Sequence, residues 1–181
     1  FAIEPFAGTV HMGGNFLAAG GQPRAFLAAV DSATGAATAW DPNPDGTVRA
    51  IHATCDRIYV GGFFTSIGGQ ARNRLASLNP TTGLAQSWNP DANGPVFALT
   101  LSPGAIYVGG VLTTVGGQSR SRVAAVNPVS GAVTAWNPSP NGTVRSIVAG
   151  GGEVFLGGAF SGVGTLASGN LAGVSADATI T

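Results

Sequence analysis

Short runs of alternating apolar and polar residues, separated by turn residues, recur along the whole chain. In one representative stretch they occupy the ranges 47–53, 57–64, 74–78 and 84–88. Val48 and Ala50 fall on one side of the first run and Arg49 falls on the other, the alternation expected of a strand. Gly and Pro recur too often for a helix of useful length. The pattern therefore predicts four short strands.

The residues between these runs have the chemistry of tight turns. The third and fourth runs are joined at 79–83 by Asn-Pro-Thr-Thr-Gly, in which Asn initiates a turn, Pro fixes φ and Gly accepts the left-handed conformation. A Gly-Gly-Gln turn at 68–70 follows the second run, and an Asn- and Pro-rich segment at 89–94 leads to the next set of strands. We expect a tight hairpin at 79–83, a turn at 68–70 and a crossover at 89–94.

This four-strand pattern is one copy of a repeat of 48 residues. Gly-Gly pairs begin at Gly13, Gly61, Gly109 and Gly157, and tryptophans with the same spacing stand at positions 40, 88 and 136. The ranges 57–94 and 105–142 align without a gap and are identical at 20 of 38 positions. The fourth copy keeps its glycine pair and loses the tryptophan. Self-similarity at a fixed period indicates a repeat architecture.

Four strands in each unit of 40–50 residues are typical of a β-propeller blade. We expect an all-β fold, a propeller of about four blades of four antiparallel strands, with approximate repeats 1–48, 49–96, 97–144 and 145–181. A β-solenoid is the competing architecture. The range 1–181 is then a single propeller domain, closed by a last outer strand at 177–181, or a propeller fragment. In the second case an oligomer or the remainder of a longer chain completes the ring.

Composition narrows the function. The 181 residues have no net charge, no lysine and only 9% charged residues, which argues against nucleic-acid binding and against a polybasic membrane patch. Hydrophobic residues at 44% exclude a disordered chain. No run of 18 apolar residues is present, so we expect no membrane insertion. The single cysteine, Cys55, excludes an internal disulfide and a zinc site built of several thiolates.

The repeat resembles a known family. It is similar to the "delta-sixty" repeats of large secreted bacterial proteins in Ile-Tyr-Val-Gly-Gly-Phe-Phe-Thr at 58–65, Gly-Gly-Gln at 68–70, Arg-Leu-Ala at 74–76, Asn-Pro-Thr-Thr-Gly at 79–83 and Trp-Asn-Pro at 88–90. The Tyr-Val-Gly-Gly core also resembles the kelch motif, although Leu78 and Val126 replace the kelch tyrosine of the third strand. The resemblance implies a β-propeller, an extracellular or cell-surface setting, a binding or scaffolding role and no catalytic residues.

One loop has the composition of a cation site. Asp41, Asn43 and Asp45, followed by Gly46, spell the opening D-x-N-x-D-G of a calcium loop. Against this, His52 occupies the position at which such a loop carries a bidentate acid. The alternative is a turn between blades that Asx and Pro residues build in every repeat. Calcium at Asp41, Asn43 and Asp45 and a purely structural turn are both open at this point.

Two further sets of residues recur at the 48-residue step. The first set is Arg24, Arg72 and Arg120, which could grip carboxylates or sugar hydroxyls or could cap carbonyl groups. Arg74 and Arg122 follow two residues later, and we expect them on the same face of a strand. The second set is Trp40, Trp88 and Trp136, which could stack on sugars or pack between blades.

Catalysis has little support in the sequence. The two histidines, His11 and His52, fall in different strands of different repeats, and the glycines follow the repeat rather than a phosphate-binding loop. We expect a non-enzymatic extracellular propeller, a protein-interaction or structural scaffold module, without a cofactor. The alternative is a carbohydrate-binding propeller with repeated weak sites. In either case we expect a protein or glycan partner that binds at the propeller surface.

Overall fold

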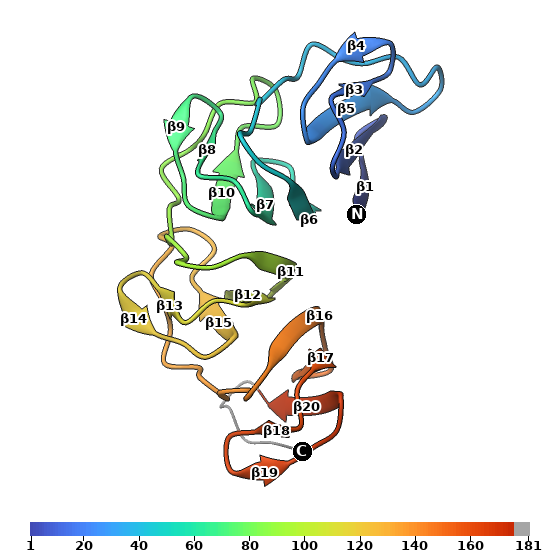
Figure 1. Ribbon diagram of the computed structural model, residues 1–181. Helices are drawn as coiled ribbons and strands as arrows, with labels where there is room; N and C mark the ends of the chain where they lie inside the picture. Colours follow the sequence, from blue (N-terminus) through green and yellow to red (C-terminus); the bar gives the residue numbers. More distant parts are fainter. Residues whose placement is uncertain (176–181) are drawn as a thin grey trace. The chain divides into compact units, whose positions relative to one another are not determined.

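The computed structural model describes residues 1–175, and all its regular elements are β-strands (Figure 1). Each 48-residue repeat supplies five strands. The repeats are β1 (Ala2–Phe6), β2 (Thr9–Gly13), β3 (Ala18–Ala19), β4 (Gln22–Pro23) and β5 (Leu27–Asp31); β6 (Val48–Ala53), β7 (Ile58–Gly62), β8 (Ser66–Ile67), β9 (Gln70–Ala71) and β10 (Leu75–Leu78); β11 (Val96–Ser102), β12 (Ala105–Gly110), β13 (Thr114–Val115), β14 (Gln118–Ser119) and β15 (Val123–Val126); and β16 (Thr143–Gly150), β17 (Glu153–Ala159), β18 (Gly162–Val163), β19 (Leu166–Ala167) and β20 (Leu171–Ser175). The predicted all-β repeat fold, four sheets of propeller-blade type, is confirmed.

In every repeat three strands form one antiparallel sheet, in the orders β1-β2-β5, β6-β7-β10, β11-β12-β15 and β16-β17-β20. The two remaining short strands form a separate hairpin, such as β8 with β9. Its two-residue loop is Gly68-Gly69, with φ of +60° and +76°. Two consecutive positive φ values define the turn that matches strand twist, which explains the glycine pair at this place. The hairpin was expected only as a turn.

The expected fourth strand at 84–88 is an irregular edge segment. It joins β10 through one isolated bridge, Leu78 to Ala85, and the backbone N–H of Gln86 donates to the carbonyl of Ser77 at 2.8 Å. The carbonyl of Gln86 accepts from the side chain of Arg72 instead of from a backbone amide. A regular ladder therefore cannot continue. The fourth strand predicted at 177–181 lies outside the described residues.

The chain divides into two compact units, Phe1–Asn89 and Pro90–Thr181. In the first unit one face of the sheet β1-β2-β5 packs against one face of the next sheet, β6-β7-β10. In each such pair we call the face of the earlier sheet its trailing face and the face of the later sheet its leading face. Gly13 lies on that trailing face, and a Cβ added to it would be 2.8 Å from Val48 Cγ1 and 3.2 Å from Ile51 Cδ1. The glycine thus leaves room for two apolar side chains of the following repeat. Both sheets contribute to one core, whose members include Leu27, Ala29, Trp40, Val48, Ile51, Ile58, Val60 and Leu78.

The second unit repeats this packing with its own residues. A Cβ added to Gly109, on the trailing face of β11-β12-β15, would be 2.7 Å from both Val144 Cγ1 and Ile147 Cδ1 of the next sheet. The shared core includes Tyr107, Val123, Ala125, Trp136, Val144, Ile147, Val154, Leu156, Ala172 and Val174. Within each unit, therefore, two sheets stack face to face with the glycine of one sheet opposite the apolar residues of the next.

Candidate functional site

The recurrent arginines tie the small hairpin of each repeat to the irregular edge segment. Arg72 follows β9, and its guanidinium donates at 2.8 Å to the carbonyl of Ala71 and at 2.8 Å to that of Gln86. Arg24 binds the carbonyls of Pro23 and Thr38 in the same way. Carbonyl capping, one of the two roles expected for this set, is therefore what the side chains do in the structure.

Arg120 completes the set and is the most buried of the three, with 8% of its surface exposed. It donates to the carbonyls of Ser119 and Thr134 and to Oε1 of Gln118. In all three arginines the Nη donors are engaged by the chain itself, and the Nε–H that has no hydrogen-bond partner is buried. The geometry thus assigns Arg24, Arg72 and Arg120 to the framework of the repeat and gives no support to a ligand site.

The second arginine position differs from the expectation. Arg74 and Arg122 lie between strands with φ of +64° and +66°, so the left-handed backbone breaks the alternation that would place Arg72 and Arg74 on one strand face. Arg74 donates to the carbonyl of Phe64 at 3.4 Å, and Arg122 to that of Val111 at 3.2 Å. The prediction that Arg72 and Arg74 share one face of a strand is wrong, because both residues lie between β9 and β10.

The recurrent tryptophans are buried. Their exposed fractions are 4% for Trp40, 0% for Trp88 and 5% for Trp136. In the first unit the indole N–H of Trp40 donates to the carbonyl of Asn79 at 3.0 Å, a contact from one repeat to the next. In the second, Trp136 makes the equivalent bond to Ser175.

Each indole also packs edge-on against an aromatic ring of its own repeat. The ring centroids are 4.9 Å apart for His11 and Trp40, 5.2 Å for Tyr59 and Trp88, and 4.9 Å for Tyr107 and Trp136. Edge-to-face pairs of this kind add stability beyond the area that they bury. A sugar could stack on Trp40 or Trp136 only if the two sheets of their unit separated, so the burial supports packing between repeats as the role of these two indoles.

The Asp41 loop uses its oxygens inside the chain. Oδ1 of Asp45 accepts the backbone N–H groups of Thr65 at 2.7 Å and Ser66 at 3.0 Å, and Oδ2 accepts the hydroxyl of Thr65. Burial opposes ionisation of this carboxyl, but the hydrogen bonds outweigh it and hold the pKa of Asp45 below its ordinary value. Asn93 makes the same two backbone contacts in the next repeat, with Thr113 and Thr114.

The other two residues of that loop point to different partners or to solvent. Oδ2 of Asp41 lies 3.5 Å from Nη1 of Arg24, and Asn43 is exposed with φ of +44°. Because an amide oxygen replaces the Asp45 carboxylate in later repeats, a structural turn explains this position without a cation. Within residues 1–175, no three His, Cys, Asp or Glu side chains are grouped so that they could hold a metal ion. Of the two alternatives left open for Asp41, Asn43 and Asp45, these contacts support the structural turn.

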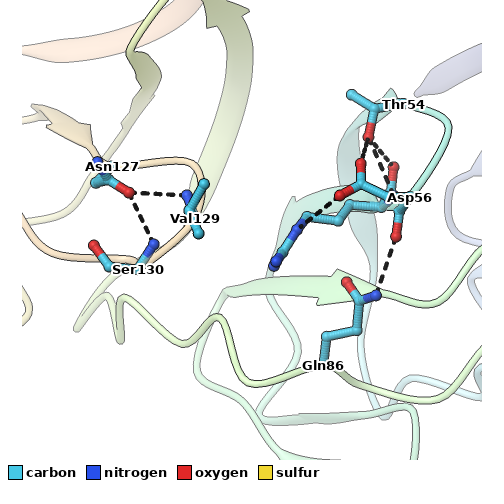
Figure 2. A network of polar contacts seen from close by, with 7 residues as sticks. Thr54, Asp56, Gln86, Asn127, Val129 and Ser130 are labelled. Carbon is cyan, nitrogen blue, oxygen red and sulfur yellow. Dashed lines mark hydrogen bonds and ion pairs between the residues drawn. The ribbon is translucent and has the colours of Figure 1, made fainter.

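The polar networks at the turns join residues of the same repeat. Figure 2 shows Thr54 Oγ1 donating to Asp56 Oδ1 at 2.9 Å, and Gln86 Nε2 donating to the carbonyl of Asp56 at 3.0 Å. In a separate turn, Oδ1 of Asn127 accepts from the backbone N–H groups of Val129 and Ser130 at 2.9 and 2.8 Å (Figure 2). Asn79 does the same with Thr81 and Thr82, which confirms the tight turn predicted at 79–83.

One more position recurs at the 48-residue step in the first strand of the repeats, and the contacts that its residues make were not predicted. A β-bulge between Val48 and Ala50 places Arg49 outside the ladder, and bulges at the same step fall at Phe97 and Arg145. Cζ of Arg49 lies 3.9 Å from the centroid of the Phe1 ring, and Cζ of Arg145 lies 6.0 Å from that of Phe97. The signal was available, because Phe1, Arg49, Phe97 and Arg145 are 48 residues apart and alternate between aromatic and cationic.

The first unit also has an open cavity of about 440 Å³. Phe1, Ile3, Met12 and Phe16 line it, together with glycines and alanines and the single polar side chain of Asn15. No catalytic side chain lies among its lining residues, so the cavity is an apolar recess at the surface of the first repeat.

Comparisons with known proteins assign no family to the chain. No family model matches it, and no curated protein matches it. Among solved structures, it is similar to the computationally designed Ika8 protein, with a TM-score of 0.46 and 12% identity over 98% of this chain and 56% of that one. The chain therefore spans little more than half the length of that protein. It is an all-β module of four repeated units that resembles a designed propeller.

No helix in residues 1–175 is long and apolar enough to cross a membrane.

Proposed function

We propose that the chain is a non-enzymatic, extracellular β-propeller module that acts as a protein-interaction or structural scaffold. One observation supports this proposal above the others: the residues that recur in the first three repeats are engaged in holding the repeat together. The arginines cap carbonyl groups, the tryptophans are buried and the Asx residues close turns. Binding is then left to the exposed hairpins and loops.

The secreted bacterial setting rests on the resemblance to delta-sixty and kelch-like repeats. The residues that carry the resemblance have structural roles here: Gly62 approaches the carbonyl of Thr47, and Tyr59 packs on Trp88. A motif made of close approaches and core aromatics specifies an architecture rather than a reaction.

The chemistry-bearing side chains support a non-enzymatic role. His11 is 3% exposed and packs against Trp40, and His52 Nδ1 lies 3.8 Å from Glu4 Oε1. Cys55 is a free, exposed thiol in a turn. In the described part of the chain, the side chains of His11 and His52 each lie against a neighbouring side chain of the fold, Trp40 and Glu4 respectively.

Binding arrays can test the proposal against carbohydrate recognition. The purified chain would be screened on a glycan array and, in parallel, cross-linked to secreted and surface proteins of the producing cells, with each captured protein then purified and titrated. We expect a protein partner with a measurable dissociation constant and no glycan signal.

A matched variant locates the surface. Gln22, Gln70 and Gln118 stand at one exposed position of the hairpins, and alanine at all three should weaken partner binding while leaving the fold intact. Glycan binding without a protein partner would overturn the proposal in favour of the carbohydrate-binding propeller. Turnover of any substrate by the pure chain would overturn it in favour of an enzyme.

A further inference from the structure

The first sheet exposes an apolar residue whose equivalents in the second and fourth repeats are buried. Ile3 lies in β1, directly opposite Met12, on the face that points away from the second repeat, and it is 73% exposed. The residues at the same repeat position, Ile51 and Ile147, are 9% and 7% exposed because each packs on the preceding sheet. The leading face of the first sheet, which carries Ile3, therefore has no sheet against it within the first unit.

The fourth sheet exposes its opposite face. Leu171 is 68% exposed and Phe155 is 42% exposed. Their equivalents in the third repeat, Val123 and Tyr107, are 0% and 7% exposed, since the fourth sheet covers them. The trailing face of the fourth sheet thus carries the apolar residues of an interface without the partner that the same face has one repeat earlier.

The internal interfaces show what fits such a face. At Gly13 and Gly109 the following repeat inserts an isoleucine, Ile51 or Ile147, over the glycine. Gly157 occupies the same position in the fourth sheet, between Leu171 and Ser146. An added Cβ at Gly157 would meet only the side chain of Ser146, in its own sheet. The glycine opening is present, and among residues 1–175 no isoleucine fills it.

The bulge residues identify the same occupant independently. Phe1, Arg49, Phe97 and Arg145 alternate along the repeats, and cation–π contacts join Phe1 to Arg49 and Phe97 to Arg145. The residue that continues the alternation after Arg145 is a phenylalanine. A repeat that begins with Phe1 and carries Ile3 supplies both side chains at the required spacing.

We propose that the trailing face of the fourth sheet binds the leading face of the first sheet of a second copy of this chain. Ile3 of one copy packs over Gly157 of the other, between Leu171 and Phe155, and Phe1 stacks on Arg145. The contact is heterologous, because different faces meet, and two such contacts close a dimer. Two chains would supply eight blades, which is within the range known for propellers. This inference does not depend on the proposed function.

Sedimentation over a wide concentration range tests the proposal. We expect the wild-type chain to pass from 17.8 kDa to twice that mass as its concentration rises. Ile3→Asp and Leu171→Asp each place a charge in the contact and should weaken association at least about 30-fold, the loss typical of a central apolar anchor. Leu84→Asp and Val129→Asp alter turn residues that are 60% and 69% exposed and should leave association unchanged.

A mixing experiment tests the head-to-tail geometry. Ile3→Asp retains an intact trailing face and Leu171→Asp an intact leading face, so an equimolar mixture should form 1:1 heterodimers more tightly than either variant associates alone. Because Ile3 and Leu171 are exposed in the single chain, both variants should keep the wild-type circular dichroism spectrum.

Three results would overturn the proposal. The first is a wild-type chain that stays at the mass of one chain at all concentrations. This holds also where Ile3→Asp lowers the stability of the single chain without changing its mass. The second is an equal loss of association in the turn variants. The third is a mixture that associates no better than its components.

Discussion

Replacing Gly109 with alanine tests whether the glycines are there to admit the next sheet. The added methyl group would lie 2.7 Å from Val144 Cγ1 and 2.7 Å from Ile147 Cδ1, whereas carbon atoms in contact are normally about 3.5–4.0 Å apart. Overpacking of this kind costs about 1–3 kcal/mol. Removing a glycine from a strand returns about 0.5–1 kcal/mol. We expect Gly109→Ala to lower the free energy of unfolding by about 1–2 kcal/mol.

The matched control is Gly157→Ala, at the same repeat position on the uncovered fourth sheet. There the methyl group would meet only Oγ of Ser146, an exposed side chain that can rotate away. At a concentration where the chain is monomeric, this variant should stay within about 0.5 kcal/mol of wild type. Guanidinium denaturation followed by tryptophan fluorescence and circular dichroism measures both. Equal destabilisation of the two variants, or none in Gly109→Ala, would refute the reasoning.

Substitutions at three other positions test individual side chains. Burial lowers the pKa of His11 below 6.5, so the unfolded chain binds the proton more tightly; the free energy of unfolding should fall as the pH drops below about 6.5, and His11→Tyr should remove that part of the dependence in a pH series of melts. Arg72→Lys cannot bridge the carbonyls of Ala71 and Gln86 and should cost about 1–2 kcal/mol in chemical denaturation; an unchanged midpoint would contradict the capping role. Asp45→Asn should be nearly neutral and Asp45→Ala should cost about 1 kcal/mol, with the reverse order indicating a need for charge.

The repeat carried most of the fold prediction. The spacing of Gly13, Gly61, Gly109 and Gly157 defined the unit, and the strands predicted at 47–53, 57–64 and 74–78 correspond to β6, β7 and β10. These strands are predictable because their alternation and their turns act locally. The predicted turn at 79–83 was equally local, since Asn79 needs only its own backbone two and three residues ahead.

The features that were mispredicted or left undecided depend on contacts between residues that are distant in sequence. The segment 84–88 has a strand-like composition, yet Arg72 binds the carbonyl of Gln86, 14 residues away, in place of a ladder partner. Asp45 has the composition of a calcium ligand, yet it closes a turn at Thr65 and Ser66, some 20 residues ahead. Sequence gave both alternatives for the arginines, the tryptophans and the Asp41 loop, and only the packed chain distinguishes between them.

The central claim is that the tryptophans are interior residues of stacked sheets. Acrylamide quenching of three variants, each keeping one of Trp40, Trp88 and Trp136 and carrying phenylalanine at the other two positions, measures this directly. We predict that all three indoles emit as buried rings and are strongly protected from the quencher, with Trp88, which is 0% exposed, protected most. Quenching of any of them as fast as that of a free indole in water would contradict the account.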